Sequence, residues 1–261
     1  MNNKLDSVLL IDNSNMRTKL MFCDDNGELI PVGVLSTREL TVEAFKKACS
    51  PYRFARVVAC SVVPWVEEVI KSSFDVPVYF LTAESCFNVK FNYKNINGLG
   101  ADRVANVLGM VATGRVPGIA VDLGTAITFE VVVSGESGPE FMGGAIAPGL
   151  LTMARALSTN TAKLPDVETF EECVAIATCT EDAVRAGCVY GCCGLVTSLL
   201  DNIVKELGYR PYVVATGGDS QLIASRLDCV DEIDSMLTFK GLQYAAQFIF
   251  SKSQIFVASW S

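Results

Sequence analysis

Near the middle of the chain lies the segment Gly118-Ile119-Ala120-Val121-Asp122-Leu123-Gly124-Thr125-Ala126-Ile127-Thr128. Its apolar first half predicts a buried strand ending at Asp122, Gly124 permits a tight turn, and residues 129–133 predict a returning strand. The tip of such a hairpin gathers backbone N–H groups, a carboxylate and the hydroxyl of Thr125, which suits a phosphate group and its cation. One hairpin of this kind is weak evidence, because Asp and Gly are common in hairpin turns.

A second segment near the N-terminus has the same pattern: Val8-Leu9-Leu10-Ile11-Asp12-Asn13-Ser14-Asn15-Met16-Arg17-Thr18-Lys19. When Asp12 is aligned with Asp122, both aspartates follow a mostly aliphatic run, and Asn15 falls on Thr125. A repeat at so long a spacing predicts two related domains and not a solenoid, whose periods are shorter. Chance similarity between two apolar hairpins is the alternative.

The composition and net charge limit the kinds of molecule that the protein is expected to bind. The chain has 261 residues, half of them hydrophobic, which is enough for one large or two modest domains with a substantial core. Lys plus Arg is 21 and Asp plus Glu is 29, so the net charge is 21 − 29 = −8. An acidic chain argues against binding to nucleic acid or to an anionic membrane.

The chain contains ten cysteines and no histidine. No two cysteines form a C-x-x-C pair, so a zinc site would need thiolates at unusual spacing. Catalysis by Ser-His-Asp or Cys-His is excluded, and a general base must be a carboxylate, Lys, Tyr or Cys. Residues 1–6 lack a signal-peptide layout, and no uninterrupted apolar run approaches membrane-spanning length. These features favour a reducing cytoplasm, where a disulfide between Cys192 and Cys193 would be rare.

Secondary-structure patterns predict an α/β protein. In the first half, strands are expected at 28–34, 56–61 and 76–81, and helices at 41–49 and 63–73. Strands followed by strand–helix alternation predict a mixed sheet. A glycine-containing stretch at 113–118 marks a boundary, so the predicted domains are residues 1–114 and 115–261. In the second half we expect a strand at 212–215, helices at 150–157, 183–207, 220–227 and 241–250, and a tail that is a short strand or disordered.

A polar loop, residues 92–100, leads into a predicted helix at 101–112 that carries Asp102 and Arg103 in its first turn. An Asp at that position also has a purely structural explanation, because it complements the helix dipole. A cation at a helix N-terminus is unfavourable. Arg103 is therefore better explained by an anionic ligand.

Two further segments suit an anion. Residues 142–149 are rich in glycine and could admit a ligand close to the backbone. Thr216-Gly217-Gly218-Asp219 follows a predicted strand and opens a predicted helix, an arrangement that recurs at anion and nucleotide sites. An ordinary turn between strand and helix explains it equally well. Thr180 is expected to cap the long helix that follows it.

Together these segments resemble the type III pantothenate kinases, within the larger fold family of acetate and sugar kinases, Hsp70 and actin. The resemblance covers nearly the whole chain and rests on ordered motifs: Asp12-Asn13-Ser14-Asn15 with Lys19, Gly100-Ala101-Asp102-Arg103, Asp122-Leu123-Gly124-Thr125, Gly143–Gly149, Thr161–Pro165, Thr180–Ala183 and Thr216-Gly217-Gly218. It implies two actin-like (ribonuclease H-like) domains, each a mixed β-sheet flanked by helices, with a cleft between them.

The resemblance also implies an activity. Members of the family phosphorylate pantothenate with ATP and Mg²⁺ to give 4'-phosphopantothenate, the first step of coenzyme A biosynthesis. They need a monovalent cation, K⁺ or NH₄⁺, and they are homodimers. The chemistry agrees with the residues present, because phosphoryl transfer depends on positioning and charge neutralisation and a carboxylate can serve as its base.

The resemblance implies a role for each site residue. Asp12 would hold the hydrated magnesium, Asp122 the monovalent cation, and Asp102 would be the base on the pantothenate hydroxyl. The nucleotide would be bound by Asp12, Asn13, Ser14, Asn15, Met16, Arg17, Thr18, Lys19 and Thr125. Pantothenate would be bound by Tyr93, Gly100, Ala101, Asp102, Arg103 and Thr180.

Ser14 departs from the family pattern, which usually has Gly at this position. A Cβ there would crowd a backbone that approaches phosphate, or would exclude a positive φ. The serine is either tolerated, its hydroxyl adding a donor, or it weakens ATP binding. Two other functions therefore stay open: a non-catalytic relative that binds a nucleotide or metabolite as a regulator, and a kinase for another small hydroxy acid or sugar.

Overall fold

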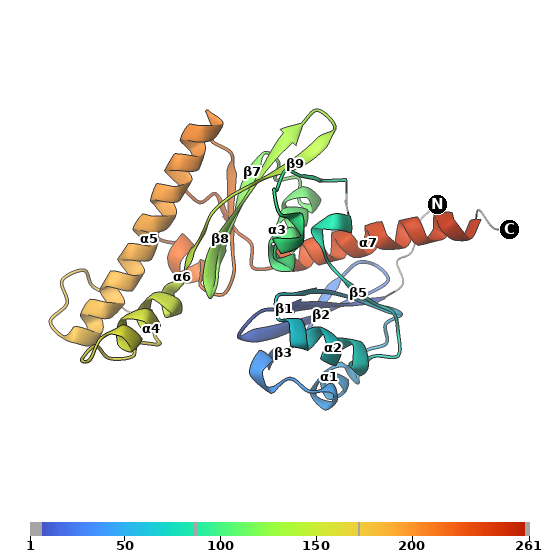
Figure 1. Cartoon of the computed structure of the whole chain (residues 1–261), viewed down its shortest axis with the longest axis horizontal. Coiled ribbons are helices and arrows are strands. Elements are labelled where there is room, and N and C mark those ends of the chain that lie inside the picture. The colour runs from blue at the N-terminus through green and yellow to red at the C-terminus, as the bar shows by residue number, and fades with distance from the viewer. Residues whose placement is uncertain (1–6, 86–87, 172, 259–261) are drawn as a thin grey trace. The chain divides into compact units, whose positions relative to one another are not determined.

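The computed structural model describes residues 7–85, 88–171 and 173–258 (Figure 1). The expectations about residues 1–6, Cys86 and the last three residues of the tail lie outside these. The chain packs as two compact units. The first comprises Met1–Gly114, Gly135–Phe141 and Met236–Ser261, and the second comprises Arg115–Ser134 and Met142–Ser235. The chain thus passes into the second unit after Gly114 and returns twice to the first.

The first unit is built on a five-stranded sheet in the order β3-β2-β1-β4-β5. Strand β1 pairs antiparallel with β2 and parallel with β4, so the sheet is mixed as predicted. Its strands are β1 (Val8–Asn13), β2 (Arg17–Cys23), β3 (Leu29–Ser36), β4 (Arg56–Ser61) and β5 (Val78–Phe80).

Helices cover both faces of this sheet (Figure 1). Leu9 and Ile11 point to one face, where they share a core with Phe45 of α1 (Val42–Cys49) and Ile70 of α2 (Pro64–Ser73). The other face packs against α3 (Ala101–Ala112) and α7 (Leu237–Ala258). Because strand side chains alternate between faces, both sides of β1 are buried, and every residue of this strand is buried.

Helices α3 and α7 of the first unit touch through their backbones. A Cβ added at Gly241 would lie 1.8 Å from the carbonyl oxygen of Ala105, and one added at Gly109 would lie 2.4 Å from that of Leu237. The hydroxyl of Thr238 donates a 2.8 Å hydrogen bond to Asn106 Oδ1 beside this crossing. The glycines let α7 fix the helix that carries Asp102 and Arg103.

The second unit contains the other acidic hairpin, formed by β7 (Gly118–Leu123) and β8 (Ala126–Gly135). The sheet order is β12-β11-β7-β8-β9-β6, with β10 paired to β8. The remaining strands of this sheet are β6 (Lys90–Phe91), β9 (Gly138–Gly143), β10 (Ile146–Pro148), β11 (Tyr212–Thr216) and β12 (Glu232–Ile233). In the division into units, β6 and residues 138–141 of β9 belong to the first unit.

The strand, acidic turn and returning strand predicted for both segments are confirmed by the strand pairing. Asp12 lies opposite Lys19 in the antiparallel partner and opposite Cys60 in the parallel one. Asp122 has the corresponding neighbours, Thr128 and Thr216. Each aspartate therefore sits near the end of a strand that has an antiparallel hairpin partner on one side and a parallel strand on the other.

The second unit also holds α4 (Leu150–Asn160), α5 (Thr180–Leu207) and α6 (Ser220–Ala224). One stripe of α5, including Val184, Cys188 and Val196, is buried in the core of this unit. By length and composition alone, α5 is the one described helix that could cross a membrane, and 39% of its apolar window is buried inside the unit. Core helices pass the same test, so the finding is weak evidence for a membrane span.

Three details of the prediction were wrong. Helix α5 begins at Thr180 with Cys179 as its N-cap, so Thr180 is the first helical residue and not the cap. Helix α6 ends at Ala224, three residues early, and α7 continues through Ala258 where a strand or disorder was expected. The short strands β6, β9, β10 and β12 were not anticipated, because two to six residues carry too little pattern.

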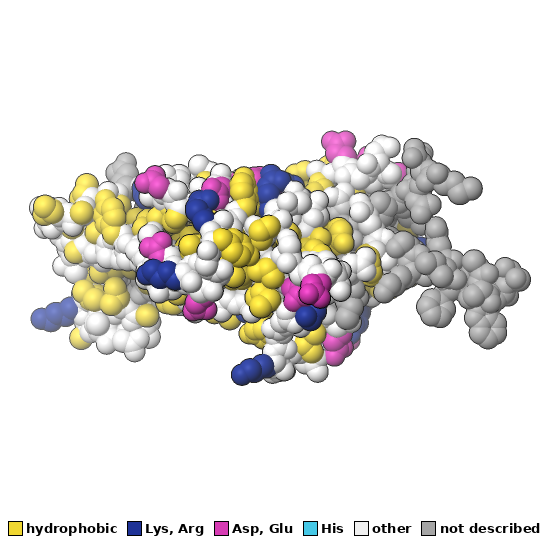
Figure 2. Space-filling view, turned by 90° about the horizontal axis from the view of Figure 1, so that it is seen from above, with side chains coloured by type: hydrophobic (Ala, Val, Ile, Leu, Met, Phe, Trp, Pro, Cys, Tyr) yellow, Lys and Arg dark blue, Asp and Glu magenta, His cyan; other side chains and the backbone are white. Residues whose placement is uncertain are grey.

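Charged side chains of both signs are interspersed on the face drawn in Figure 2, with hydrophobic side chains between them. Among the described residues, the most exposed large hydrophobic side chains are Ile176, Ile146, Val34 and Val174. Single apolar side chains of this kind are normal on a protein surface.

Candidate functional site

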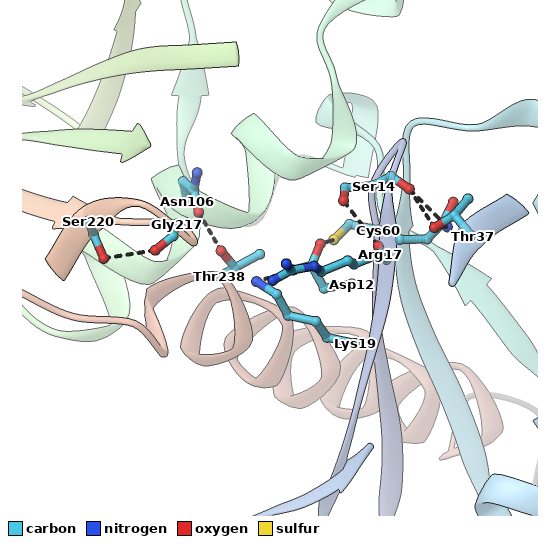
Figure 3. Close-up of polar contacts among 11 residues, drawn as sticks. Asp12, Ser14, Arg17, Lys19, Thr37, Cys60, Asn106, Gly217, Ser220 and Thr238 are labelled. Atoms are coloured by element: carbon cyan, nitrogen blue, oxygen red, sulfur yellow. Dashed lines mark hydrogen bonds and ion pairs between the residues drawn. The ribbon is translucent and has the colours of Figure 1, made fainter. Parts of the chain in front are cut away.

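The turn between β1 and β2 presents the first candidate site. Asp12 is only 7% exposed and Asn13 only 1%. Lys19 Nζ lies 3.5 Å from Asp12 Oδ2, and the thiol of Cys60 donates to Asp12 Oδ1 at 3.6 Å (Figure 3). The cation and the thiol fix the direction of the carboxylate at the end of the strand.

Ser14 fits this turn without strain. Its backbone N–H and its hydroxyl both donate to the carbonyl oxygen of Arg17 at 3.0 Å (Figure 3). Among the described non-glycine residues, only Asn88 has a positive φ, so the turn does not require glycine at position 14. Asn15 and Arg17 are exposed and Met16 is half-buried. The side chains at the tip of the turn are therefore accessible from solvent.

A buried hydrogen-bond network stabilises the turn between β1 and β2. Asn13 Nδ2 donates to Thr18 Oγ1 at 2.7 Å, and the hydroxyls of Thr18 and Thr37 are 3.1 Å apart. Thr37 donates to the carbonyl oxygen of Ser14 at 2.8 Å, and Ser61 donates to Asn13 Oδ1 at 2.7 Å. Sequence reasoning missed Thr37 and Ser61. Ser61 carried a usable signal, because it ends a predicted strand.

The N-terminus of α3 forms the second part of the site in the first unit. Gly100 is the N-cap, and Asp102 Oδ1 accepts a 2.8 Å hydrogen bond from the backbone N–H of Arg103. Burial raises the pKa of Asp102, and the charge of Asp12 raises it further, against the lowering effects of that N–H and of the Arg103 guanidinium. Burial, followed by Asp12 and Asp102, also raises the pKa of Cys60 well above its ordinary value. The structure therefore brings the carboxylates of Asp12 and Asp102 into one neighbourhood.

Arg103 is 5% exposed, which is unusual for a cation at a helix start. Its Cζ lies 5.9 Å from the ring centroid of Tyr93 and 5.7 Å from that of Phe141. Tyr93 is 36% exposed, so one of the two rings reaches solvent. The prediction grouped Tyr93 with Arg103 and missed Phe141, because nothing local in the sequence connects position 141 to the loop at 92–100.

A pocket of about 610 Å³ adjoins this helix start in the first unit. Its wall mixes apolar groups with hydroxyl, amide and carboxylate groups, and it includes the predicted substrate residues Gly100 and Ala101. The other lining residues are Ser61, Val62, Glu67, Phe80, Leu81, Thr82, Ala83, Glu84, Ile96, Asn97, Gly98 and Leu99. The volume falls in the usual range for small-molecule sites.

In the second unit, two of the predicted motifs meet at Asp122. Gly217 has a φ of +94°, and a Cβ at that position would lie 2.4 Å from Asp122 Oδ1, so both conformation and space require glycine. The backbone N–H of Asp219 donates to the carbonyl oxygen of Leu123 at 2.9 Å. The Gly-Gly turn is thus packed directly on the acidic hairpin.

A third motif joins the same hairpin. The carbonyl oxygen of Thr125 accepts hydrogen bonds from the N–H of Gly149 at 3.0 Å and from the hydroxyl of Thr152 at 2.6 Å. The side chain of Thr125 lies at an exposed position. Thr180 is also exposed and belongs to this second unit, whereas Tyr93 and Gly100 to Arg103 belong to the first.

The described residues contain no group of three or more His, Cys, Asp or Glu side chains that could hold a metal ion by themselves. A metal site built from protein side chains alone is therefore absent from the described residues. Magnesium in phosphoryl-transfer sites is held by one or two carboxylates, waters and the phosphates themselves, so the buried carboxylate of Asp12 fits it. The carboxylate oxygens of Asp122 fit a cation that prefers oxygen ligands.

The two mixed sheets, each with an acidic hairpin, define a class of protein by its fold, the actin-like fold. A glucokinase from an Antarctic psychrotroph superposes with a TM-score of 0.53 over 93% of this chain and 99% of its own, at 11% identity. The activator of 2-hydroxyisocaproyl-CoA dehydratase from Clostridium difficile, solved with bound ADPNP, gives 0.52 over 98% of each chain at 13% identity. At these identities the likeness concerns the fold.

Sequence comparison identifies the family within this class. The model for type III pantothenate kinase matches residues 8–202. A type III pantothenate kinase of Akkermansia muciniphila is 42% identical over 92% of this chain and 98% of its own. One from Methylacidiphilum infernorum is 35% identical over 95% and 90%. The chain belongs to the type III pantothenate kinase family, and it is a kinase.

Proposed function

We propose that this chain transfers the γ-phosphoryl group of ATP to the hydroxyl of pantothenate, giving 4'-phosphopantothenate in the first step of coenzyme A biosynthesis. The observation that carries the proposal is that Asp102 and Asp12 lie in the same unit, where the charge of Asp12 helps to raise the pKa of Asp102. One carboxylate has a raised pKa and begins a helix beside a pocket, and the other ends the strand that leads into the phosphate loop. A base and a phosphate-binding turn side by side are what phosphoryl transfer to an alcohol needs.

In the proposed reaction, the pantothenate hydroxyl oxygen attacks the γ-phosphorus. Its proton passes to the carboxylate of Asp102, a new P–O bond forms, and the bond to the β-phosphate oxygen breaks to release ADP. A raised pKa makes Asp102 a stronger base than an ordinary aspartate. Lys19, which pairs with Asp12, supplies positive charge beside the phosphates.

Recognition of pantothenate is proposed for the residues around the start of α3. Arg103 would bind the substrate carboxylate, which explains a buried guanidinium at a helix N-terminus. Tyr93 would cover the substrate from the exposed side, while Gly100 and Ala101 line the pocket. Thr180, from the second unit, is proposed as a further pantothenate contact on the strength of the family resemblance.

The nucleotide is assigned to the turn from Asp12 to Lys19 and to Thr125. Asp12 would hold the hydrated magnesium, and Asp122 the monovalent cation, K⁺ or NH₄⁺. When bound, these cations neutralise phosphate charge as it shifts toward the leaving group. The protein's own part is to hold the phosphates and to keep Asp12 oriented through Lys19 and Cys60.

We also propose a homodimer and a cytoplasmic location. One side of α5 carries Tyr190, which is 47% exposed, and three glycines, Gly187, Gly191 and Gly194. A Cβ added at any of these glycines would meet nothing within 4 Å. Small residues with an aromatic neighbour suit close helix packing between two copies. The molar mass in solution, measured by light scattering, tests the dimer.

A coupled ADP-release assay tests the proposed activity. We expect ADP release to require pantothenate and to rise several-fold when K⁺ or NH₄⁺ replaces Na⁺. ADP release with a different hydroxy acid or sugar, and none with pantothenate, would identify a kinase of another substrate. Nucleotide binding without ADP release from any acceptor would identify a regulator.

Ser14→Gly is expected to change the KM for ATP by less than about threefold. The serine adds one solvent-accessible hydrogen bond to Arg17, and such bonds contribute about 0.5–1.5 kcal/mol. The turn keeps its shape without it, because the backbone N–H of the same residue makes the same contact. Steady-state kinetics with varied ATP measure the change, and a shift of tenfold or more in either direction would contradict this account of the turn.

A further inference from the structure

Arg103 lies against a pair of aromatic rings that come from distant parts of the chain and that contact each other. Its Cζ lies over the rings of Tyr93 and Phe141, and these rings lie 5.9 Å apart, centroid to centroid, at an interplanar angle of 34°. Phe141 is fully buried, whereas Tyr93 is partly exposed. Of the two rings, Phe141 is therefore the one that solvent and substrate do not reach in the described structure.

The strand that carries Phe141 is fixed to the loop that carries Tyr93. Strand β6 pairs with β9 so that Phe91 lies opposite Phe141, and the N–H of Asn92 donates to the Phe141 carbonyl at 2.9 Å. Glu140 accepts from Lys90 Nζ at 3.1 Å and from Asn92 Nδ2 at 2.7 Å. These hydrogen bonds lower the pKa of Glu140, so it stays ionised and keeps both contacts. The aromatic ring at position 141 is therefore held in a fixed place against Arg103.

A ring face is suited to orient a guanidinium. The five N–H donors of Arg lie in the plane of the group, so a ring above that plane attracts the cation without occupying a donor. A cation–π contact of this kind is stronger where water is excluded. Because a long Arg side chain loses rotamer entropy on binding, a ring that restrains it beforehand improves affinity for an anion.

We propose that Phe141 is a positioning residue that sets the Arg103 guanidinium for the substrate carboxylate and so favours anionic pantothenate over neutral analogues. The inference rests on the proposed function. Phe141 touches Arg103 and not the reacting atoms, so its effect falls on recognition of the carboxylate. Binding of ATP and the chemical step depend on other residues and are unaffected.

Phe141→Leu removes the ring and tests the proposal in steady-state kinetics with two acceptors, pantothenate and the neutral analogue in which an alcohol replaces the carboxylate. The KM for pantothenate is expected to rise about tenfold, which corresponds to about 1.4 kcal/mol. The kcat, the KM for ATP and the KM for the neutral analogue are expected to stay within about twofold. Phe141→Tyr, which keeps a ring face, is expected to retain the preference for pantothenate.

Phe91→Leu is the matched control. The Phe91 ring packs on Phe141 at a centroid distance of 5.7 Å, so the control removes a ring from the same cluster. It is expected to leave the preference for pantothenate over the neutral analogue within about twofold. In an Arg103→Lys background, adding Phe141→Leu is expected to raise the KM for pantothenate by less than threefold, because the two residues act as a unit.

Several results would overturn the inference. One is a Phe141→Leu enzyme whose KM rises equally for both acceptors, and another is a Phe91→Leu enzyme with the same loss of preference. If the leucine variant unfolds, Phe141→Met, with a volume near that of Phe, replaces it, and the same changes in KM are expected. A parent enzyme that neither phosphorylates nor binds pantothenate, checked by calorimetry, would overturn the proposed function and this inference with it. If the parent enzyme phosphorylates pantothenate, the proposed function holds, and the Phe141 variants then test the inference alone.

Discussion

Asp102→Asn is expected to lower kcat by about 10² to 10⁴-fold while the affinity for ATP stays within about twofold. A positioned general base contributes a factor of this size. The amide oxygen of Asn can still accept the N–H of Arg103, as Asp102 Oδ1 does at 2.8 Å, but the amide cannot take the proton of the acceptor alcohol. The geometry of the helix start is thereby retained and the basic group is lost.

Coupled ADP release measures turnover, and calorimetric titration with ATP measures binding. Asp25→Asn is the matched control, because it makes the same chemical change at an exposed position in the first unit. It is expected to leave both quantities unchanged. Turnover by Asp102→Asn at the parent rate would remove Asp102 from its assigned role.

The same substitution is expected to preserve or raise the melting temperature at neutral pH. The pKa of Asp102 is raised in the folded state, chiefly by burial, so folding favours the protonated form. A group of this kind stabilises fully below its unfolded pKa of about 3.9, and that stability is lost as the pH rises through the folded pKa. The ionised carboxylate thus opposes folding at neutral pH, and Asn removes that cost. The advantage of the variant in thermal melting should shrink as the pH falls toward 4.

Gly241→Ala is expected to destabilise the first unit by about 3 kcal/mol. In an open helix the same change would stabilise, because Ala has the higher helix propensity. Here the new Cβ would lie 1.8 Å from the Ala105 carbonyl oxygen and 2.8 Å from the Gly109 nitrogen, and both are backbone atoms of a buried helix. The helices must separate, which moves the helix start that carries Asp102 and Arg103.

Thermal melting is expected to show a fall on the order of 10 °C for Gly241→Ala, together with a loss of kinase activity at temperatures where the parent is stable. Gly33→Ala is the matched control, because a Cβ at Gly33 meets nothing within 4 Å. A Gly241→Ala protein that melts with the parent would show that α3 and α7 are farther apart than described.

Local sequence pattern predicted the parts of the fold that depend on near neighbours. Strand β4 has the expected bounds because an apolar run is closed by polar residues on both sides. Helix α1 follows Thr41, whose hydroxyl accepts the N–H of Ala44 at 3.1 Å as a capping residue should. The two acidic hairpins were recognised because strand, turn and strand are contiguous.

Contacts between distant segments could not be predicted in this way. The pairing of Phe91 with Phe141 has no local signature, since the register of such short strands is fixed by the packing around them. For that reason Phe141 was missed while its neighbour Arg103 was found. The support of the phosphate loop by Thr37 is of the same kind, because Thr37 reaches Ser14 and Thr18 only when the strands have assembled.

The return of α7 to the first unit has a consequence for the synthesis of this protein on the ribosome. The ribosome makes the strands and first three helices of that unit early, but the helix that closes over α3 begins only at Leu237. At ordinary elongation rates this delay is on the order of ten seconds. Throughout that time the part of the sheet face that α7 covers, beside α3, is accessible to chaperones, and it is buried only near the end of translation.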